Sequence, residues 1–323
     1  MSVTVPNALR HAVIDELGGE AWIAGLDQLV ERATQRWGLQ VGEPFPSGMA
    51  AWTAPATSMA HGDVVVKISF PHEESRHEAA ALAAWRQSGA VELIDDDPTD
   101  QALLLSRVRP GTSLRDAQLE LEEHLEVGAQ ILSGFATARI PAGDPFQDLV
   151  SIADGLASIA EDGIDRTLHS APYRVDLDLV RHTVALLRTL PPSASQRGLN
   201  HGDLNPGNVL GHDNHGDDRT VKWVAIDPKP VWGDLAWDPW PLITQWGPWL
   251  TSTPQPAELA RRAAVVSQTI GLDPARVASW AAVRSTLSAL AASERGWWTG
   301  YRGADGDFDR ATTWNRAAAM LGG

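Results

Sequence analysis

The chain contains no cysteine and almost no lysine. None of its 323 residues is a cysteine, which excludes disulfides, zinc–thiolate sites and thiol catalysis and is typical of a reducing compartment. Only three of its 26 basic residues are lysines, namely Lys67, Lys222 and Lys229. Arginine is therefore the ordinary cation of this sequence, and the positions of the three lysines are informative.

The chain also lacks an excess of positive charge and long apolar runs. Its 41 acidic residues outnumber the 26 basic ones and give a formal charge of −15, which disfavours nonspecific binding to nucleic acid or anionic lipid. No run approaches the roughly 18 uncharged apolar residues of a membrane helix, and the first thirty residues hold no signal-peptide core. We therefore expect a cytoplasmic protein, a monomer or weak dimer, that binds neither nucleic acid nor membranes.

Hydrophobic periodicity changes along the chain from β-rich to helical. Two helices are predicted first, over residues 6–18 and 20–37. They are followed by strands at 39–44, 52–59 and 63–69, a helix at 71–87, and strands at 90–94 and 101–108. Helices at 114–138, 146–161 and 175–190, a hairpin at 207–226 and further helices complete the predicted order. This order predicts an α+β fold with a small β-rich N-lobe, residues 1–108, and a larger α-rich C-lobe, residues 109–323.

The segment His201-Gly-Asp203-Leu-Asn-Pro-Gly-Asn208 and the strand end Val224-Ala-Ile-Asp227 carry the most specific chemistry. Mg²⁺ prefers hard oxygen ligands and keeps some of its waters, so one Asn, one Asp and substrate phosphates suffice to hold it. A separate carboxylate must orient the attacking hydroxyl and accept its proton. We predict that Asp203 is this base and that Asn208 and Asp227 bind the metal. A Walker phosphate loop is excluded because no Gly-Lys dipeptide occurs.

A lysine inside an apolar strand adds to this set. Lys67 ends the run Val64-Val-Val-Lys67 and is the only lysine of the first 221 residues. A buried charge is costly without a partner, and phosphotransferases of the kinase type use such a lysine, held by a glutamate of the next helix, to bind phosphates. We predict Glu78 as the partner, with Glu74 as the alternative one helical turn earlier.

These motifs together resemble the aminoglycoside phosphotransferase family, which is related to protein kinases. The run Asp227-Pro-Lys-Pro-Val-Trp-Gly-Asp234-Leu-Ala-Trp-Asp238-Pro resembles the streptomycin 6-kinase and hydroxyurea kinase branch. The resemblance implies a bilobal protein-kinase-like fold and Mg²⁺-dependent transfer of the γ-phosphate of ATP to a hydroxyl of a small molecule. It also implies that the linker from Ser106 to Val108 binds adenine.

The sequence departs from the family pattern at several positions. Asn205 stands where the branch often has histidine, and Leu235 and Trp237 replace the usual proline and tyrosine. The segment expected to cover the phosphates lacks G-x-G-x-x-G, and we expect Ser47 and Gly48 to approach the phosphates instead.

The acceptor site is the least specified part of the sequence. Ten of the 14 tryptophans fall between Trp223 and Trp314; most are expected in the core, and some could stack on a sugar or a cation. Candidate acceptor-binding residues are Asp234, Asp238, Glu294 and Trp297. Seven aspartates between residues 201 and 240 favour a positively charged acceptor.

The sequence supports three hypotheses about the function. The first is an antibiotic-resistance kinase that phosphorylates an aminoglycoside such as streptomycin. The second is a metabolic kinase of an amino sugar such as glucosamine, or a kinase of hydroxyurea, since one scaffold serves many acceptors. The third is a catalytically weak nucleotide-binding scaffold, which the presence of Lys67, Asp203, Asn208 and Asp227 disfavours.

Overall fold

The computed structural model divides the chain into two compact units, Met1–Gly111 and Thr112–Gly323. It describes residues 3–46, 48–140, 145–170, 176–213, 221–245, 254–295 and 304–322. Each unit is described by itself below.

Unit 1 is built on an antiparallel sheet of five strands in the order β1-β2-β3-β5-β4. Its elements are α1 (Asn7–Val13), α2 (Gly19–Trp37), β1 (Leu39–Val41), β2 (Ala51–Ser58), β3 (Gly62–Ser69), η1 (Glu73–Ser75), α3 (Glu78–Ala84), β4 (Leu93–Asp97) and β5 (Ala102–Ser106). The strands are rich in the β-branched and apolar residues that favour a pleated, half-buried surface.

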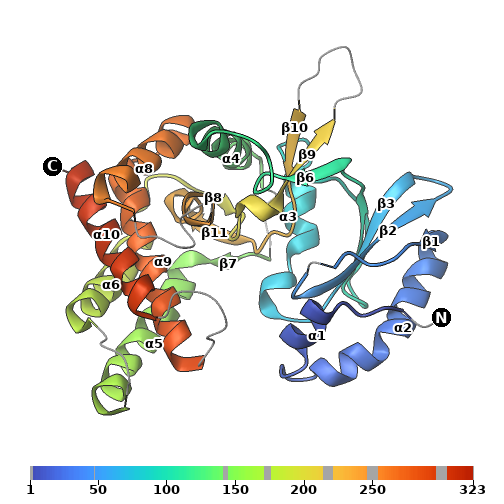
Figure 1. Cartoon of the computed structure of the whole chain (residues 1–323), viewed down its shortest axis with the longest axis horizontal. Helices are drawn as coiled ribbons and strands as arrows, with labels where there is room; N and C mark the ends of the chain where they lie inside the picture. The colour runs from blue at the N-terminus through green and yellow to red at the C-terminus, as the bar shows by residue number, and fades with distance from the viewer. Residues whose placement is uncertain are drawn as a thin grey trace. The chain divides into compact units, whose positions relative to one another are not determined.

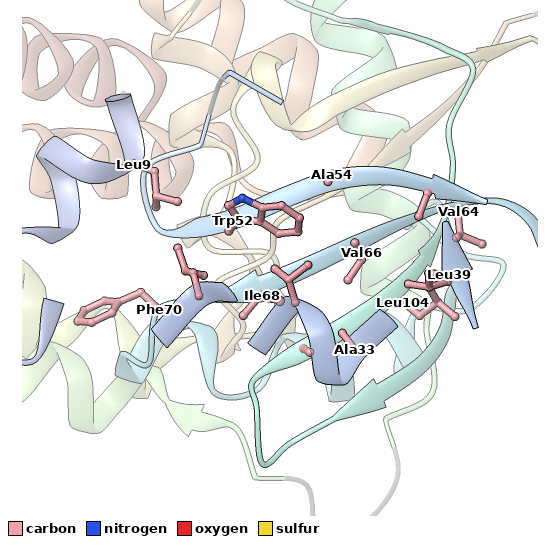
Figure 2. Packing of buried hydrophobic residues seen from close by; sticks show 14 of the residues in the cluster. Leu9, Ala33, Leu39, Trp52, Ala54, Val64, Val66, Ile68, Phe70 and Leu104 are labelled. Atoms are coloured by element: carbon pink, nitrogen blue, oxygen red, sulfur yellow. The ribbon is translucent and has the colours of Figure 1, made fainter. Parts of the chain in front are cut away.

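The core of unit 1 lies between one face of this sheet and the two N-terminal helices (Figures 1 and 2). Val64, Val66 and Ile68 of β3 are fully buried there against residues of α1 and α2. Since successive strand residues point to opposite faces, Lys67 projects from the other face of β3. The alternation of β3 therefore separates the apolar core from the charged side chain.

The acidic strand β4 is held in the sheet by α2. Arg36 lies 3.6 Å from the Asp95 carboxylate and 3.3 Å from that of Asp97, and the Trp37 indole donates to Asp95 at 2.7 Å. These contacts compensate two of the three consecutive aspartates that the prediction left outside the strand. The structure places this strand at Leu93–Asp97, not at 90–94.

The predicted helix over residues 71–87 is divided in two. A 3₁₀ turn, η1, is closed by the His72 and Ser75 side chains, and α3 starts only at Glu78. The break places Glu78 in the first turn of α3, where a carboxylate interacts favourably with the helix dipole.

Unit 2 is mainly helical. Its elements, with β6 crossing from unit 1, are β6 (Pro110–Ser113), α4 (Leu121–Ala136), β7 (Gln147–Asp148), α5 (Leu149–Ser170), α6 (Leu177–Thr189), η2 (Pro191–Ser193), β8 (Arg197–Asn200), η3 (Pro206–Asn208), β9 (Val209–Asp213), β10 (Val221–Ala225), β11 (Val231–Asp234), η4 (Leu235–Trp237), α7 (Trp240–Thr244), α8 (Pro256–Ile270), α9 (Pro274–Arg295) and α10 (Ala304–Gly322). Helices α8, α9 and α10 pack on one another (Figure 1).

Two predictions for unit 2 were wrong. The helix expected from residue 114 begins at Leu121, because the backbone amides of Leu114 and Arg115 donate to Val209 and Pro206 instead of continuing a helix. The segment after residue 226 was expected to be helical, but Val231–Asp234 forms β11, which pairs antiparallel with β8 and parallel with β7. No helix within the described ranges is long and apolar enough to cross a membrane.

Candidate active site

Lys67 and Glu78 form a buried ion pair in unit 1. The Lys67 ammonium lies 2.7 Å from each carboxylate oxygen of Glu78, and only 9% and 4% of the two side chains is exposed. Lys67 stands opposite Thr53 of β2 and Leu103 of β5 in the sheet register. The pair predicted from the strand pattern therefore forms, with Glu78 as the partner. The side chain of the alternative, Glu74, lies outside the described residues.

Of the other predicted nucleotide-binding residues, the structure describes Gly48, Ser106 and Val108 in unit 1. Gly48 is exposed in the segment between β1 and β2, while Ser47 lies outside the described residues. Ser106 ends β5, where its backbone N–H donates to the Glu92 carbonyl and its hydroxyl donates to the Glu92 carboxylate at 2.8 Å. Val108 is half-buried in the following segment.

In unit 2, two strand pairings bring together the distant segments that were predicted to be catalytic. Asn200, the last residue of β8, stands opposite Val231 of β11, and the Lys229 amide just before β11 donates to the His201 carbonyl at 2.8 Å. In the hairpin, Val209 of β9 stands opposite Ala225 of β10. The first amide after β10, that of Ile226, donates to the Asn208 carbonyl at 2.9 Å. The loop of Asp203 thus lies beside the segment of Asp227.

Hydrogen-bond donors and charges of both signs lie near the Asp203 carboxylate. Its carboxylate accepts a hydrogen bond from the Asn205 amide at 3.2 Å and lies 3.6 Å from the Lys229 ammonium. Burial raises the pKa of this carboxyl above its ordinary value, while Lys229, Asn205 and Arg284 oppose the shift. A quarter of the side chain is exposed. Asp203 therefore combines access to a ligand with an environment that tunes its basicity.

Asn205 occupies the position where the related branch often has histidine. Its carbonyl oxygen accepts from the Gly207 amide at 2.9 Å and from Arg115 at 3.1 Å, which leaves its NH₂ group to donate to Asp203. An amide thus supplies one donor to the Asp203 carboxylate and is itself held from two sides.

Asp238 holds the backbone of the same loop. Its two carboxylate oxygens accept the amide protons of His201 at 2.6 Å and Gly202 at 2.7 Å. Only 3% of the residue is exposed, and burial raises the pKa of this carboxyl to about 6. We expected Asp238 to bind the acceptor, but its burial and its two amide partners argue against direct contact. It is a positioning residue for the Asp203 loop.

Asp234 is also engaged by the protein. Its carboxylate accepts from the Arg276 guanidinium at 2.7 Å and the Trp280 indole at 2.6 Å, and 2% of the residue is exposed. This geometry argues against the predicted contact with an acceptor and assigns Asp234 to the packing of η4 against α9. The side chain of Glu294 and the whole of Trp297, the remaining acceptor candidates, lie outside the described residues.

Arg284 of α9 also contacts the loop, a role that the sequence did not indicate. Its guanidinium lies over the rings of Trp237 and Trp240, at 4.4 and 4.6 Å, and donates to the Gly202 carbonyl at 3.0 Å. It is 82 residues from Gly202 in sequence, so no local motif could reveal the contact. At least these two tryptophans hold a side chain of the protein rather than a ligand.

The residues predicted to hold Mg²⁺ have suitable chemistry. Asn208 uses its NH₂ group to donate to the Asp203 carbonyl at 2.9 Å, so its amide oxygen points elsewhere. Asp227 is exposed and has a φ of 59°, a left-handed conformation that costs energy for a non-glycine residue and is often found at functional sites. Among the described residues no group of three or more His, Cys, Asp or Glu side chains forms a metal cage. An Asn and an Asp fit Mg²⁺ that takes its other ligands from phosphates and water.

The fold defines the class of protein. Solved structures with the same fold include a choline kinase from Streptococcus pneumoniae, with a TM-score of 0.58, 13% identity and coverage of 91% of this chain and 99% of that one. A macrolide 2′-phosphotransferase from Brachybacterium faecium gives a TM-score of 0.55 at 14% identity over 90% of this chain and 98% of that one. The α+β, protein-kinase-like fold predicted from the sequence is confirmed.

The family is narrower than the fold. Residues 48–296 match the model of the aminoglycoside/hydroxyurea antibiotic resistance kinases, and the chain belongs to this family. It is 28% identical over 291 residues to a streptomycin 6-kinase from Streptomyces glaucescens, covering 89% of this chain and 90% of the relative. It is 29% identical to a hydroxyurea phosphotransferase from Kitasatospora aureofaciens, covering 84% and 74%. The chain is therefore a phosphotransferase that acts on a hydroxyl group, as the sequence predicted.

Proposed function

We propose that the enzyme transfers the γ-phosphoryl group of ATP, with Mg²⁺, to a hydroxyl of an aminoglycoside such as streptomycin. The observation that carries the proposal is the Asp203 carboxylate, partly exposed and 3.6 Å from the Lys229 ammonium in a loop fixed by Asp238. Family membership and the streptomycin 6-kinase relatives support the choice of acceptor.

Each residue receives one role. Asp203 orients the acceptor hydroxyl and takes its proton as the oxygen attacks phosphorus. Lys67, held by Glu78, binds nucleotide phosphates, and Ser47, Gly48, Ser106 and Val108 belong to the nucleotide site. Because the Ser106 amide already donates to Glu92, the Val108 backbone is the better candidate for adenine. Asn208 and Asp227 would hold Mg²⁺, which neutralises phosphate charge when bound.

A smaller, neutral acceptor such as hydroxyurea is the second candidate. The sequence argument for a cationic acceptor counted Asp234 and Asp238, which the structure buries among protein donors. The groups that interact with Asp203 include the cations of Lys229 and Arg284 as well as the carboxylate of Asp227. Charge of both signs does not require a cationic acceptor, and one relative is a hydroxyurea phosphotransferase.

A coupled ADP-release assay separates these candidates. The purified enzyme is screened with streptomycin, other aminoglycosides, amino sugars, neutral sugars and hydroxyurea, and NMR identifies the phosphorylated position. We expect streptomycin to give the highest kcat/KM; a preference for hydroxyurea would select the second candidate. ADP–Mg²⁺ binding without acceptor-dependent turnover would instead favour a nucleotide-binding scaffold.

The role of Asp203 has its own test. The Asp203→Asn variant keeps the side-chain volume but cannot accept the proton, so we expect kcat to fall about 10²- to 10⁴-fold with an unchanged melting temperature. The Asp178→Asn variant, which alters an exposed carboxylate on α6, serves as the control. Full activity in a folded Asp203→Asn variant would exclude Asp203 as the base.

A further inference from the structure

Lys229 lies at the accessible edge of the Asp203 carboxylate. Its ammonium is 3.6 Å from Asp203 Oδ2, and 40% of its side chain and 25% of that of Asp203 is exposed. The ammonium and the carboxylate are thus presented together at the surface of unit 2, where an acceptor hydroxyl must meet Asp203.

The backbone of Lys229 is held firmly. Pro228 and Pro230 on either side of it are buried, and its amide donates to the His201 carbonyl at 2.8 Å. Proline fixes its own φ and restricts the residue before it to extended conformations. The main chain is therefore fixed, while the four-carbon side chain can adjust the position of a compact charge.

The second cation near Asp203 is placed differently. The guanidinium of Arg284 stacks on two indoles and donates to the carbonyls of Gly202 and Trp237, at 3.0 and 3.2 Å. These contacts bind it to the scaffold of the loop. Of the two cations, Lys229 is the one whose geometry suits contact with a ligand.

The chemistry of transfer needs a cation at this place. The bond between the acceptor oxygen and the γ-phosphorus forms while the bond from phosphorus to the β,γ-bridging oxygen breaks; the proton passes to Asp203, and ADP leaves with the electron pair. In a near-attack arrangement the reacting atoms are about 3–3.5 Å apart, so the phosphoryl oxygens come within a few ångströms of Asp203 and of Lys229. Charge on these oxygens in the transition state is stabilised by a positioned cation.

We propose that Lys229 is a further catalytic residue, which contacts the oxygens of the phosphoryl group during its transfer. The proposal rests on the proposed role of Asp203 as the base. Its support is the 3.6 Å approach of the two side chains, their exposure, and the use of lysine in a chain where only three of 26 basic residues are lysines.

The test compares Lys229→Met and Lys229→Arg with Lys222→Met, a control at an exposed lysine on β10. Loss of one transition-state donor typically lowers kcat 10²- to 10³-fold. We expect such a loss in Lys229→Met, with the KM values for ATP and acceptor changed less than about threefold, partial recovery in Lys229→Arg, and no effect in Lys222→Met. The acceptor is the best substrate of the screen, or water if none is found.

A binding measurement gives a second readout that requires no acceptor. Fluoroaluminate with ADP and Mg²⁺ mimics the transferring phosphoryl group, and transition-state analogues bind more tightly than ground-state ligands. We expect fluoroaluminate to tighten ADP binding to the native enzyme and to Lys222→Met. In Lys229→Met we expect this enhancement to fall at least about tenfold, while the affinity for ADP alone is retained.

The possible results separate the two proposals. If Asp203→Asn is inactive but Lys229→Met keeps kcat within about threefold and retains the fluoroaluminate effect, Lys229 has no catalytic role. A rise in KM at constant kcat in Lys229→Met would likewise overturn the proposed catalytic role of Lys229, since that pattern indicates ground-state binding. If Asp203→Asn is fully active, the proposed function itself fails. Should Lys229→Met not fold, Lys229→Gln and Lys229→Arg are measured in its place.

Discussion

The Lys67–Glu78 ion pair allows stability and function to be tested separately. Glu78→Gln removes one charge but little volume, and leaves the Lys67 ammonium 2.7 Å from a neutral amide in a site where 9% of the lysine side chain is exposed. At a separation of about 3 Å and an effective dielectric constant of about 20, the lost Coulomb attraction is about 5 kcal/mol. Because the amide still accepts a hydrogen bond, we expect a destabilisation of about 3 kcal/mol, at the lower end for broken buried pairs.

Urea unfolding followed by circular dichroism measures this loss, and titration with ATP and Mg²⁺ measures nucleotide affinity. The Asp178→Asn variant removes a pair with Arg181 whose side chains are 94% and 62% exposed, so it should cost at most about 0.5 kcal/mol. In the double variant Lys67→Met, Glu78→Leu, apolar groups replace both charges, and we expect most of the stability to return without nucleotide binding.

Two outcomes would refute this reasoning. If Glu78→Gln lowers the free energy of unfolding by less than about 1 kcal/mol, the opposite charges of the pair contribute little to stability. Native ATP affinity in the double variant would mean that Lys67 does not bind the phosphates, even though the ion pair is present in the structure.

Two further predictions concern the Asp203 loop. Gly202 has a φ of 81°, and a Cβ there would overlap the Lys229 carbonyl, so Gly202→Ala should abolish activity and lower the melting temperature. Gly155 in α5 has open space around it, so Gly155→Ala should do neither. Equal melting curves of the two variants would contradict this. Burial raises the pKa of Asp238 from 3.8 to about 6, so its contribution to stability is complete below about pH 4 and is lost as the pH rises through 6. Asp238→Asn should lack this loss in melting curves from pH 4 to 7; an unchanged pH dependence would contradict the assignment.

The Lys67–Glu78 pair could be predicted because local pattern decides it. A lysine in an alternating apolar strand must find a partner, and the structure shows the expected Glu78. The helix boundary before Glu78 was not predicted, because residues 73–75 form a separate 3₁₀ turn, with contacts between His72 and Ser75, instead of the first turn of the helix. The late start of α4 depends on distant residues: the amides of Leu114 and Arg115 donate to the carbonyls of Val209 and Pro206, which are far away in sequence.

On the acceptor side, the burial of two of the four candidate residues was not predicted. Asp234 and Asp238 follow Asp227 closely in sequence, and an excess of acid there indicated a cationic ligand. The structure directs these side chains inward, to Arg276 and Trp280 of α9 and to the amides of residues 201 and 202. Spacing along the chain does not reveal which carboxylates already accept hydrogen bonds from distant residues of the protein.

The sequence by itself determined the class of chemistry, since the absence of cysteine, the rarity of lysine and the spacing of Asp203, Asn208 and Asp227 leave few alternatives to phosphoryl transfer. Only the tertiary structure decided how charge is distributed around Asp203. The pairing of β8 with β11 brings Lys229 to its carboxylate, and the packing of α9 brings Arg284 to the carbonyl beside it. The physical reason is that electrostatic interactions depend on distance and burial in space, and strand pairing and helix packing set both.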